Sequence, residues 1–322
     1  MSRRMKVWVF DRYGGPEVLA MQERETPVPR AGEVLIHVLA SAVNPSDVKN
    51  LSGHFKAPIP RVPGRDFAGV VVEGDGSSGA EVWGSGPAWG VNADGAHAEY
   101  VVMPAEWVSA KPANLSAEEA ATVGVPYLAA WSALVTAGRV QQGETVLVTG
   151  VSGAVGRAAT QIAHWRGARV LGASISIDNP SGADAIIDTT KQDLASVVRE
   201  LTGGKGADLA LDTVGGTLFE ACLRSLRHGG RQMSIASNPR TVTFDLVDFY
   251  HGMKSLHGVD TMALSGPEVR GVLDELRAGF EAGVLKPPPI QAWAFADAPG
   301  AYAAVAEGHG DRKHVLKTGT PR

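Results

Sequence analysis

Short hydrophobic runs broken by Gly and Pro dominate the first third of the chain. In the run at residues 33–42, alternate positions face opposite sides of a strand and both sets are largely apolar, which is typical of a strand covered on both faces. Similar runs fall at residues 6–10, 69–73, 81–84 and 99–103. This spacing of short strands and turn residues predicts a small β-rich, barrel-like unit.

The pattern changes at Ser116, which stands three residues before Glu119. A serine at a helix N-cap and a glutamate three residues later form a capping box, and the apolar stretch 120–135 follows as a predicted helix. Beyond residue 144, strand-like and helix-like segments alternate, with strands at 145–149, 168–173, 185–188, 207–212 and 231–235. Such alternation predicts a parallel sheet with right-handed crossovers, hence a doubly wound α/β fold.

The last part of the chain, after about residue 259, contains one predicted helix at 267–282 and strand-like pieces that we expect to return to the first unit. A length of 322 residues favours two globular domains.

Composition narrows the classes of function. Hydrophobic residues make up 44% and charged residues 20%, as in folded globular proteins, and a net charge of -4 without a basic stripe argues against a nucleic-acid partner. Cys222 is the only cysteine, which excludes an internal disulfide and a site built on several thiolates. The N-terminal residues do not resemble a signal peptide and no apolar run approaches roughly 20 residues, so we expect a cytoplasmic protein without a membrane partner.

A glycine-rich turn follows the strand at 145–149 and precedes a predicted helix. Glycines let the backbone approach a pyrophosphate, whose charge then meets the free N–H groups and the positive end of the helix dipole. The position of the turn inside a strand–helix–strand alternation therefore predicts dinucleotide binding. The predicted contacts in this loop are Gly150, Ser152, Gly153, Ala154, Val155 and Gly156.

The end of the next strand predicts which nicotinamide cofactor binds. An acidic residue there would hold the ribose hydroxyls of NAD and repel the 2′-phosphate of NADPH. Ser174 and Ser176 stand at this place and no acid occurs before Asp178, so NADPH is favoured with the two serines as contacts. Later strand ends add predicted contacts to the nicotinamide half, namely Asp212, Thr213, Val214, Ile235, Ala236 and Ser237.

Two alternatives stay open at this point. Ser152 lies in a strand, Gly-x-Ser, helix sequence that also resembles the nucleophile elbow of an α/β-hydrolase, although Ala154 replaces the second glycine of that motif. A protein that binds NADPH without significant turnover, as a sensor or structural protein, would keep the same glycine loop.

Seven motifs extend over nearly the whole chain: residues 13–19, 43–47, 63–69, 95–100, 124–127, the glycine loop and 212–215. Together they resemble the zinc-independent quinone oxidoreductase branch of the medium-chain dehydrogenase/reductase superfamily. The resemblance implies a discontinuous GroES-like catalytic domain of residues 1–119 and 259–322 and a Rossmann domain of residues 120–258. It also implies hydride transfer from NADPH to a small electrophilic acceptor, a quinone or an α,β-unsaturated carbonyl compound, commonly by a homodimer.

The resemblance also indicates the positions at which zinc-dependent relatives hold their metal, and this chain lacks the ligands there. Zinc-dependent alcohol dehydrogenases of the same superfamily use an early Cys and a Gly-His-Glu element, whereas this chain has residues 44–47 and Gly64-Arg-Asp66 at those places. Thiolate and imidazole ligands are thus absent, and no metal is expected. Three features depart from the family pattern: a short segment between Ser176 and Ala185, no basic residue after the second strand, and Phe55 where related enoyl-thioester reductases have a proton-donating tyrosine.

Candidate catalytic residues follow from the same resemblance. The family places Asn44 beside the nicotinamide, where its amide could donate to a carbonyl, although a plain turn residue before Pro45 is the alternative. Asp47 could order that loop or relay a proton, with a plain salt-bridge or cap role as the equal alternative, and Tyr127 could donate a proton or pack at the domain hinge. The predicted aromatic contacts to substrate, each of which could equally belong to the core, are Phe55, Tyr127 and Tyr250.

Overall fold

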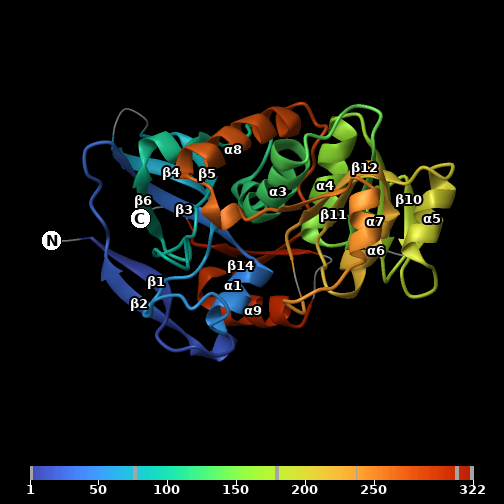
Figure 1. Cartoon of the computed structure of the whole chain (residues 1–322). Coiled ribbons are helices and arrows are strands. Elements are labelled where there is room, and N and C mark those ends of the chain that lie inside the picture. Colours follow the sequence, from blue (N-terminus) through green and yellow to red (C-terminus); the bar gives the residue numbers. More distant parts are fainter. Residues whose placement is uncertain (1–2, 75–77, 178–180, 237, 309–311, 320–322) are drawn as a thin grey trace. The chain divides into compact units, whose positions relative to one another are not determined.

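The computed structural model describes residues 3–74, 78–177, 181–236, 238–308 and 312–319. The chain divides into two compact units, one formed by Met1–Val125 with Met262–Arg322 and the other by Pro126–Thr261. The sequence analysis placed these junctions a few residues earlier, after residues 119 and 258. Most of the helices and many of the strands of both units are labelled in Figure 1.

The first unit is built on a sheet in which β3 is central and all strand pairs except the parallel pair β14–β15 are antiparallel. The strand order is β14-β15-β3-β4-β5-β7, and β6 also pairs with β3. The strands are β3 (Glu33–Val43), β4 (Asp66–Gly74), β5 (Glu81–Ser85), β6 (Tyr100–Pro104), β7 (Ser109–Ala110), β14 (Ile290–Ala294) and β15 (Lys313–Lys317), while β1 (Arg4–Phe10) and β2 (Leu19–Glu25) form a separate pair. Val34, Ile36 and Val38 enter a buried cluster and Val43 enters another, so β3 is covered on both faces as predicted.

The helices of this unit are α1 (Pro45–Leu51), α2 (Ala117–Ala121), α8 (Gly266–Glu281) and α9 (Ala298–Ala306). The capping box is confirmed at α2, where Ser116 Oγ accepts from the Glu119 N–H and the Ser116 N–H donates to Glu119 Oε2. The expectation of a single helix in the last part of the chain was wrong, since α9 follows α8. The residues of α9 are small and almost uniformly apolar, so their hydrophobic pattern has little helical periodicity and does not predict this helix.

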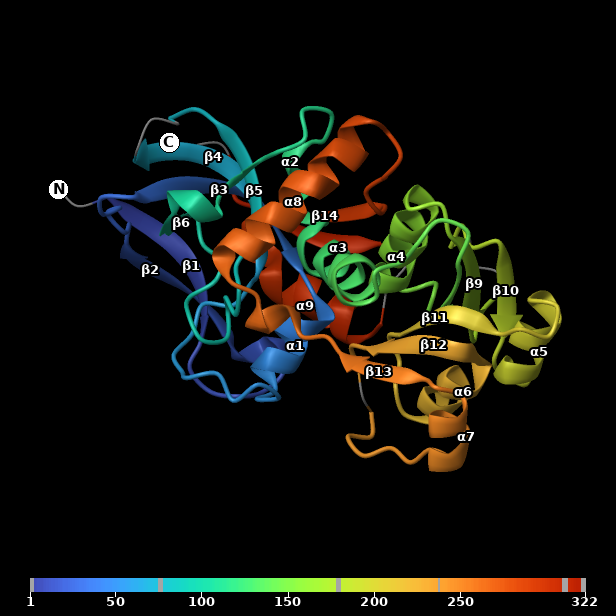
Figure 2. The same cartoon turned by 45° about the horizontal axis from the view of Figure 1, so that its top comes forward.

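The second unit is a parallel sheet of strand order β10-β9-β8-β11-β12-β13. Its elements begin with α3 (Gly124–Trp131), which the chain enters from the first unit, and a π-helical turn (Ser132–Ala137). The strands are β8 (Thr145–Thr149), β9 (Arg169–Ser174), β10 (Ala185–Asp188), β11 (Ala207–Asp212), β12 (Leu226–Ser234) and β13 (Ser255–Gly258), and the helices are α4 (Ala154–Trp165), α5 (Leu194–Leu201), α6 (Thr217–Ser225) and α7 (Leu246–His251). Figure 2 shows β11, β12 and β13 side by side, with α6 and α7 together on one face.

The order of the strands confirms the predicted doubly wound fold. The chain moves outward from β8 in one direction through β9 and β10, and in the other through β11, β12 and β13. The reversal at β8 is the place where such sheets bind ligands, at the carboxyl ends of the strands. In the described part of the segment between β9 and β10 no helix is found, because the segment is short. No helix among the described residues has the length and apolar character needed to cross a bilayer.

Candidate active site

The glycine loop joins β8 to α4 and leaves no room for side chains at two of its glycines. Gly150 has a φ of 59°, in the left-handed region that favours glycine, and an added Cβ there would lie 2.6 Å from Thr213 Oγ1. A Cβ at Gly156 would lie 2.4 Å from the Gly150 carbonyl oxygen. Gly153 is the N-cap of α4, and no side chain caps the first turn of this helix. The loop therefore offers backbone N–H groups and the helix dipole to an anion at the reversal point of the sheet.

Beside this loop, the hydroxyl group of Ser174 contacts the hydroxyl group of Ser152 and the backbone N–H of Ser176. Ser152 Oγ lies 3.0 Å from Ser174 Oγ, which in turn accepts from the Ser176 N–H at 3.1 Å. Arg157, on the first turns of α4, donates from Nε to the Ser152 carbonyl at 2.8 Å. Sequence reasoning missed this arginine because it searched for a basic residue only after the second strand. The Ser152 hydroxyl bonds to another hydroxyl rather than to an imidazole, which gives no support to the hydrolase alternative.

Asp212 at the end of β11 organises the neighbouring turns from a fully buried position. Its Oδ1 accepts from Thr149 Oγ1 at 2.9 Å and from the N–H groups of Val214 and Gly215 at 3.1 and 2.9 Å. Thr213 donates from Oγ1 to the Thr149 carbonyl, so the ends of β8 and β11 are tied together. The side chain predicted as a cofactor contact is thus engaged within the protein.

The remaining predicted contacts of the second unit lie at strand ends as expected. Ile235 and Ala236 follow β12, and the Ile235 N–H donates to the Asp212 carbonyl at 3.2 Å. Val214 is exposed beside the glycine loop, where a Gly150 Cβ would meet its methyl group. Ser237 lies outside the described residues.

In the first unit, Asn44 and Asp47 begin helix α1 together. The Asn44 N–H donates to Asp47 Oδ2 at 2.8 Å, and both side chains are buried. This contact gives Asp47 the cap role that was the alternative, and through it Asp47 also orders the loop. Burial raises the pKa of Asp47 to about 6, and the nearby Asp66 carboxylate adds to the effect.

The side chain of Asn44 links two charged groups that sequence reasoning did not select. Its Nδ2 donates to Asp66 Oδ2 at 2.9 Å, and its Oδ1 accepts from Lys313 Nζ. Both Asp66 oxygens also accept from the Val125 N–H at 3.0 Å. Asp66 lies in the motif at residues 63–69 and Lys313 lies in none of the motifs, and only the folded register of β3, β4 and β15 brings them to Asn44.

A second buried pair, His97 and Tyr302, lies beside Gly64 of the Gly64-Arg-Asp66 segment. His97 Nε2 lies 3.3 Å from the Ala42 carbonyl, which can only accept, so Nε2 carries the proton and Nδ1 accepts from the Tyr302 hydroxyl at 2.9 Å. Burial lowers the pKa of His97 to about 4, and the ring is neutral. Gly64, with a φ of 93°, makes room for this ring, since a Cβ there would lie 2.4 Å from it. Among the residues that the structure describes, no group of three or more His, Cys, Asp or Glu could hold a metal ion.

The three aromatic candidates stand in different settings. Phe55 is half-buried and packs against the core of the first unit. Tyr127 is 2% exposed, accepts a hydrogen bond from Gln161, and has a pKa raised by burial well above its usual range, which opposes proton donation. Tyr250 is 55% exposed on α7 and packs on the neighbouring His251 ring.

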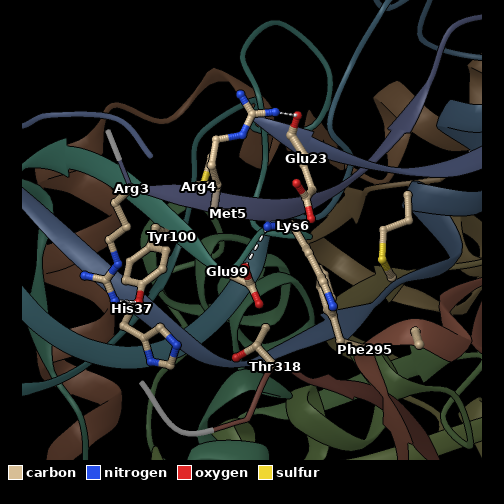
Figure 3. Close-up of a pocket in the computed structure, with 12 residues that line it drawn as sticks. Arg3, Arg4, Met5, Lys6, Glu23, His37, Glu99, Tyr100, Phe295 and Thr318 are labelled. Carbon is tan, nitrogen blue, oxygen red and sulfur yellow. Dashed lines mark hydrogen bonds between the residues drawn. The ribbon is translucent and has the colours of Figure 1, made fainter. Parts of the chain in front are cut away.

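A cavity of about 410 Å³ lies elsewhere in the first unit, between β1, β2, β3 and β6. Figure 3 shows Arg3 beside Tyr100 and His37, with the Arg3 guanidinium 4.1 Å from the Tyr100 ring centre. Lys6 and Glu99 meet across it, where the Lys6 N–H donates to Glu99 Oε2 at 2.6 Å. The cavity carries charges of both signs and none of the predicted site residues lines it, so it is separate from the two clusters above.

Comparisons with known proteins agree with this architecture. Residues 30–113 match the family model described as the alcohol dehydrogenase GroES-like domain, and residues 154–278 match the zinc-binding dehydrogenase model. The chain is 34% identical to the zinc-type alcohol dehydrogenase-like protein of Schizosaccharomyces pombe, over 83% of this chain and 82% of that protein. It is 31% identical to the quinone oxidoreductase of Homo sapiens, over 89% of this chain and 88% of that protein.

Solved structures give the same result. A mycobacterial protein complexed with NADPH superposes with a TM-score of 0.85 at 28% identity, covering 98% of this chain and 100% of the other. The likeness extends over both units of the chain.

Proposed function

The chain belongs to the medium-chain dehydrogenase/reductase superfamily, and on this premise we propose that it is a zinc-independent, NADPH-dependent reductase of quinones or α,β-unsaturated carbonyl compounds. The observation that carries the proposal is the glycine loop, which leaves the first turn of α4 without a side-chain cap at the reversal point of a parallel sheet. Relatives named quinone oxidoreductase and a similar structure complexed with NADPH support the reaction and the cofactor.

The residues of the second unit fit a dinucleotide. The backbone of residues 150–156 would hold the pyrophosphate, because a side chain at Gly150 or Gly156 would fill that space. Ser174, Ser176 and the nearby Arg157 would bind the 2′-phosphate of NADPH, whose negative charge meets no acid in the described residues 169–177. When bound, the cofactor would supply the hydride, and the protein would orient it and exclude water.

Zinc independence is supported by the side chains that stand at the metal positions of the superfamily. Asp66 is engaged with Asn44 and Val125, and the nearby imidazole of His97 is engaged with Tyr302 and Ala42. The single thiol, Cys222, is buried in the core of the second unit. In the proposed reaction Asn44 would therefore act as an amide donor to a carbonyl of the acceptor or of the nicotinamide, without a Lewis acid.

A homodimer is proposed through the free edge of β13. An edge strand exposes unpaired backbone groups, and exposed apolar side chains accompany this edge. The exposed apolar side chains on and near α7 and β13 are Leu246, Val247, Tyr250, Met253 and Leu256. Light scattering of the purified protein would test the proposal: a dimer that Leu256→Lys converts to a monomer supports it, and a wild-type monomer contradicts it.

A fluorescence titration with NADPH and NADH, followed by a panel of quinones and enones, tests the proposed function. We expect NADPH to bind at least about tenfold more tightly than NADH, a difference of about 1.4 kcal/mol, and to be oxidised by one or more acceptors. Arg157→Ala should weaken the binding of NADPH and leave the affinity for NADH unchanged. The unchanged affinity for NADH shows that the loop is intact. If NADPH binds but no acceptor oxidises it, the non-catalytic alternative is favoured. If NADPH does not bind, and the protein cleaves esters in a reaction that Ser152→Ala abolishes, the hydrolase alternative is favoured.

A further inference from the structure

The Asn44 amide bridges a buried carboxylate and a buried ammonium group. The exposed fractions of Asn44, Asp66 and Lys313 are 1%, 0% and 6%. The register of the sheet explains the meeting, because β15 pairs with β3 at His314 and Val43, one residue from Lys313 and Asn44. Asp66 begins β4 on the other side of β3, paired with Ala42. Three strands therefore bring one amide and two opposite charges together.

The two charges determine which way round the amide lies. The oxygen and the NH2 group of an asparagine have nearly the same shape, so shape alone does not distinguish the two orientations. Here the ammonium group of Lys313 can only donate, and the Asp66 oxygen accepts from the Asn44 amide and from the Val125 N–H. A half-turn of the amide would set its oxygen against the carboxylate and its NH2 group against the ammonium, replacing two attractive contacts by two repulsive ones.

The same arrangement leaves one donor for a ligand. The NH2 group of Asn44 has two hydrogens, and the bond to Asp66 uses one. A cation at the oxygen of an amide draws electron density from the nitrogen, which strengthens the remaining N–H as a donor. We propose that Lys313 and Asp66 are positioning residues that hold Asn44 with this second N–H directed to a carbonyl group in the reaction. The inference rests on the proposed role of Asn44 in hydride transfer.

Lys313→Met tests the proposal by removing the ammonium group while keeping an apolar chain of similar length. The variant should lower kcat for NADPH oxidation about 10- to 100-fold, the usual effect of a misplaced catalytic hydrogen bond, with the Kd of NADPH within about twofold. Lys317→Met is the matched control, because Lys317 lies on the same strand but is exposed and pairs with Glu118. It should keep the wild-type kcat.

A second readout does not depend on turnover. In protein labelled with ¹⁵N at asparagine, the side-chain amide signal of Asn44 can be assigned by its loss in Asn44→Asp. Lys313→Met should shift this signal and speed its hydrogen exchange, and Lys317→Met should change neither. An unchanged signal in a folded Lys313→Met protein overturns the proposed orientation.

A paired substitution separates positioning from folding. In the double variant Asn44→Asp with Asp66→Asn, the new carboxylate at position 44 can accept from Lys313, and the new amide at position 66 can donate to it and accept from Val125. Every buried group keeps a partner and the net charge is unchanged, but position 44 has no side-chain N–H. We expect a Tm close to that of wild type and a kcat as low as that of Lys313→Met.

The outcomes distinguish the two proposals. If either Lys313→Met or the double variant keeps the wild-type kcat, the positioning role is wrong. If Lys313→Met does not fold, the double variant decides. If none of the acceptors tested supports NADPH oxidation by the wild-type protein, the proposed function fails. The amide signal alone then decides the orientation of Asn44.

Discussion

The glycine loop of the second unit and the Asn44 cluster of the first unit prepare groups for a ligand by opposite means. The loop uses backbone N–H groups within residues 150–156, and an added Cβ would collide with the loop's own backbone at Gly156 and with Thr213 at Gly150. The cluster uses side chains from three distant positions, of which Lys313 and Asn44 are 269 residues apart. The loop should therefore be sensitive to an added atom, and the cluster to a removed one.

Asp66→Ala removes the acceptor shared by Asn44 and Val125 and takes from the buried Lys313 one of its two neighbouring carboxylates, the other being that of Asp47. Removal of one partner from a buried charged pair costs about 3–5 kcal/mol, so the free energy of unfolding should fall by that amount. Urea or guanidinium unfolding measures it. A loss below about 1 kcal/mol, the size expected of a surface pair, would show that the cluster does not stabilise the first unit.

Gly156→Ala adds one methyl group to the loop, at a site where the added carbon would lie 2.4 to 2.7 Å from backbone atoms of Gly150 and Val151. The loop must shift, so NADPH affinity should fall about 100-fold, equivalent to about 2.7 kcal/mol of binding free energy. Fluorescence titration measures the Kd. Gly271→Ala is the control, because a Cβ there meets no atom within 4 Å. Equal affinities of the two variants would refute the assignment of the loop.

Asp47 and His97 give the first unit two opposed pH dependences. The folded pKa of Asp47 is raised to about 6, so its contribution to stability is present at low pH and is lost as the pH rises to 6. The folded pKa of His97 is lowered to about 4, so its contribution is present above about 6.5 and is lost as the pH falls to 4. The two trends overlap and largely cancel in the wild-type protein.

Asp47→Asn should uncover the histidine trend, because the amide oxygen can still accept from the Asn44 N–H but no longer titrates. The free energy of unfolding, relative to wild type, should rise by about 2 kcal/mol between pH 4 and pH 6. Chemical unfolding at several pH values measures this difference. Parallel curves for variant and wild type would mean that Asp47 does not titrate in this range.

Lys317→Ala should have the smallest effect. Its ammonium pairs with Glu118 at 2.7 Å, but the side chains are 51% and 26% exposed. Exposed pairs contribute about 0.2–1 kcal/mol and are screened by salt. The loss of unfolding free energy should therefore stay below about 1 kcal/mol and shrink in 1 M NaCl. A loss as large as that of Asp66→Ala would remove the distinction between buried and exposed charges on this strand.

The contrast also explains which parts of the fold and of the candidate site could be predicted from the sequence. The parallel sheet, the glycine loop and the capping box at Ser116 depend on neighbours in sequence, so their patterns could be recognised. Helix α9 lacks periodicity, and the strands β2 and β13 are largely exposed and lack an apolar pattern. Asp66 could be recognised as a motif residue, but neither Asp66 nor Lys313 could be recognised as a partner of Asn44, because only strand register brings them together.

The passage of the chain out of the first unit has a consequence for recombining such domains. A Cβ at Gly124 would lie 2.1 Å from Asp66 Oδ1, and the next residue, Val125, donates its N–H to the same carboxylate. The second unit begins immediately afterwards, at Pro126. A chimaera that exchanges the cofactor-binding module should therefore take its crossover point after Val125, so that the acidic side chain keeps both the space and the hydrogen-bond donor that its own module provides.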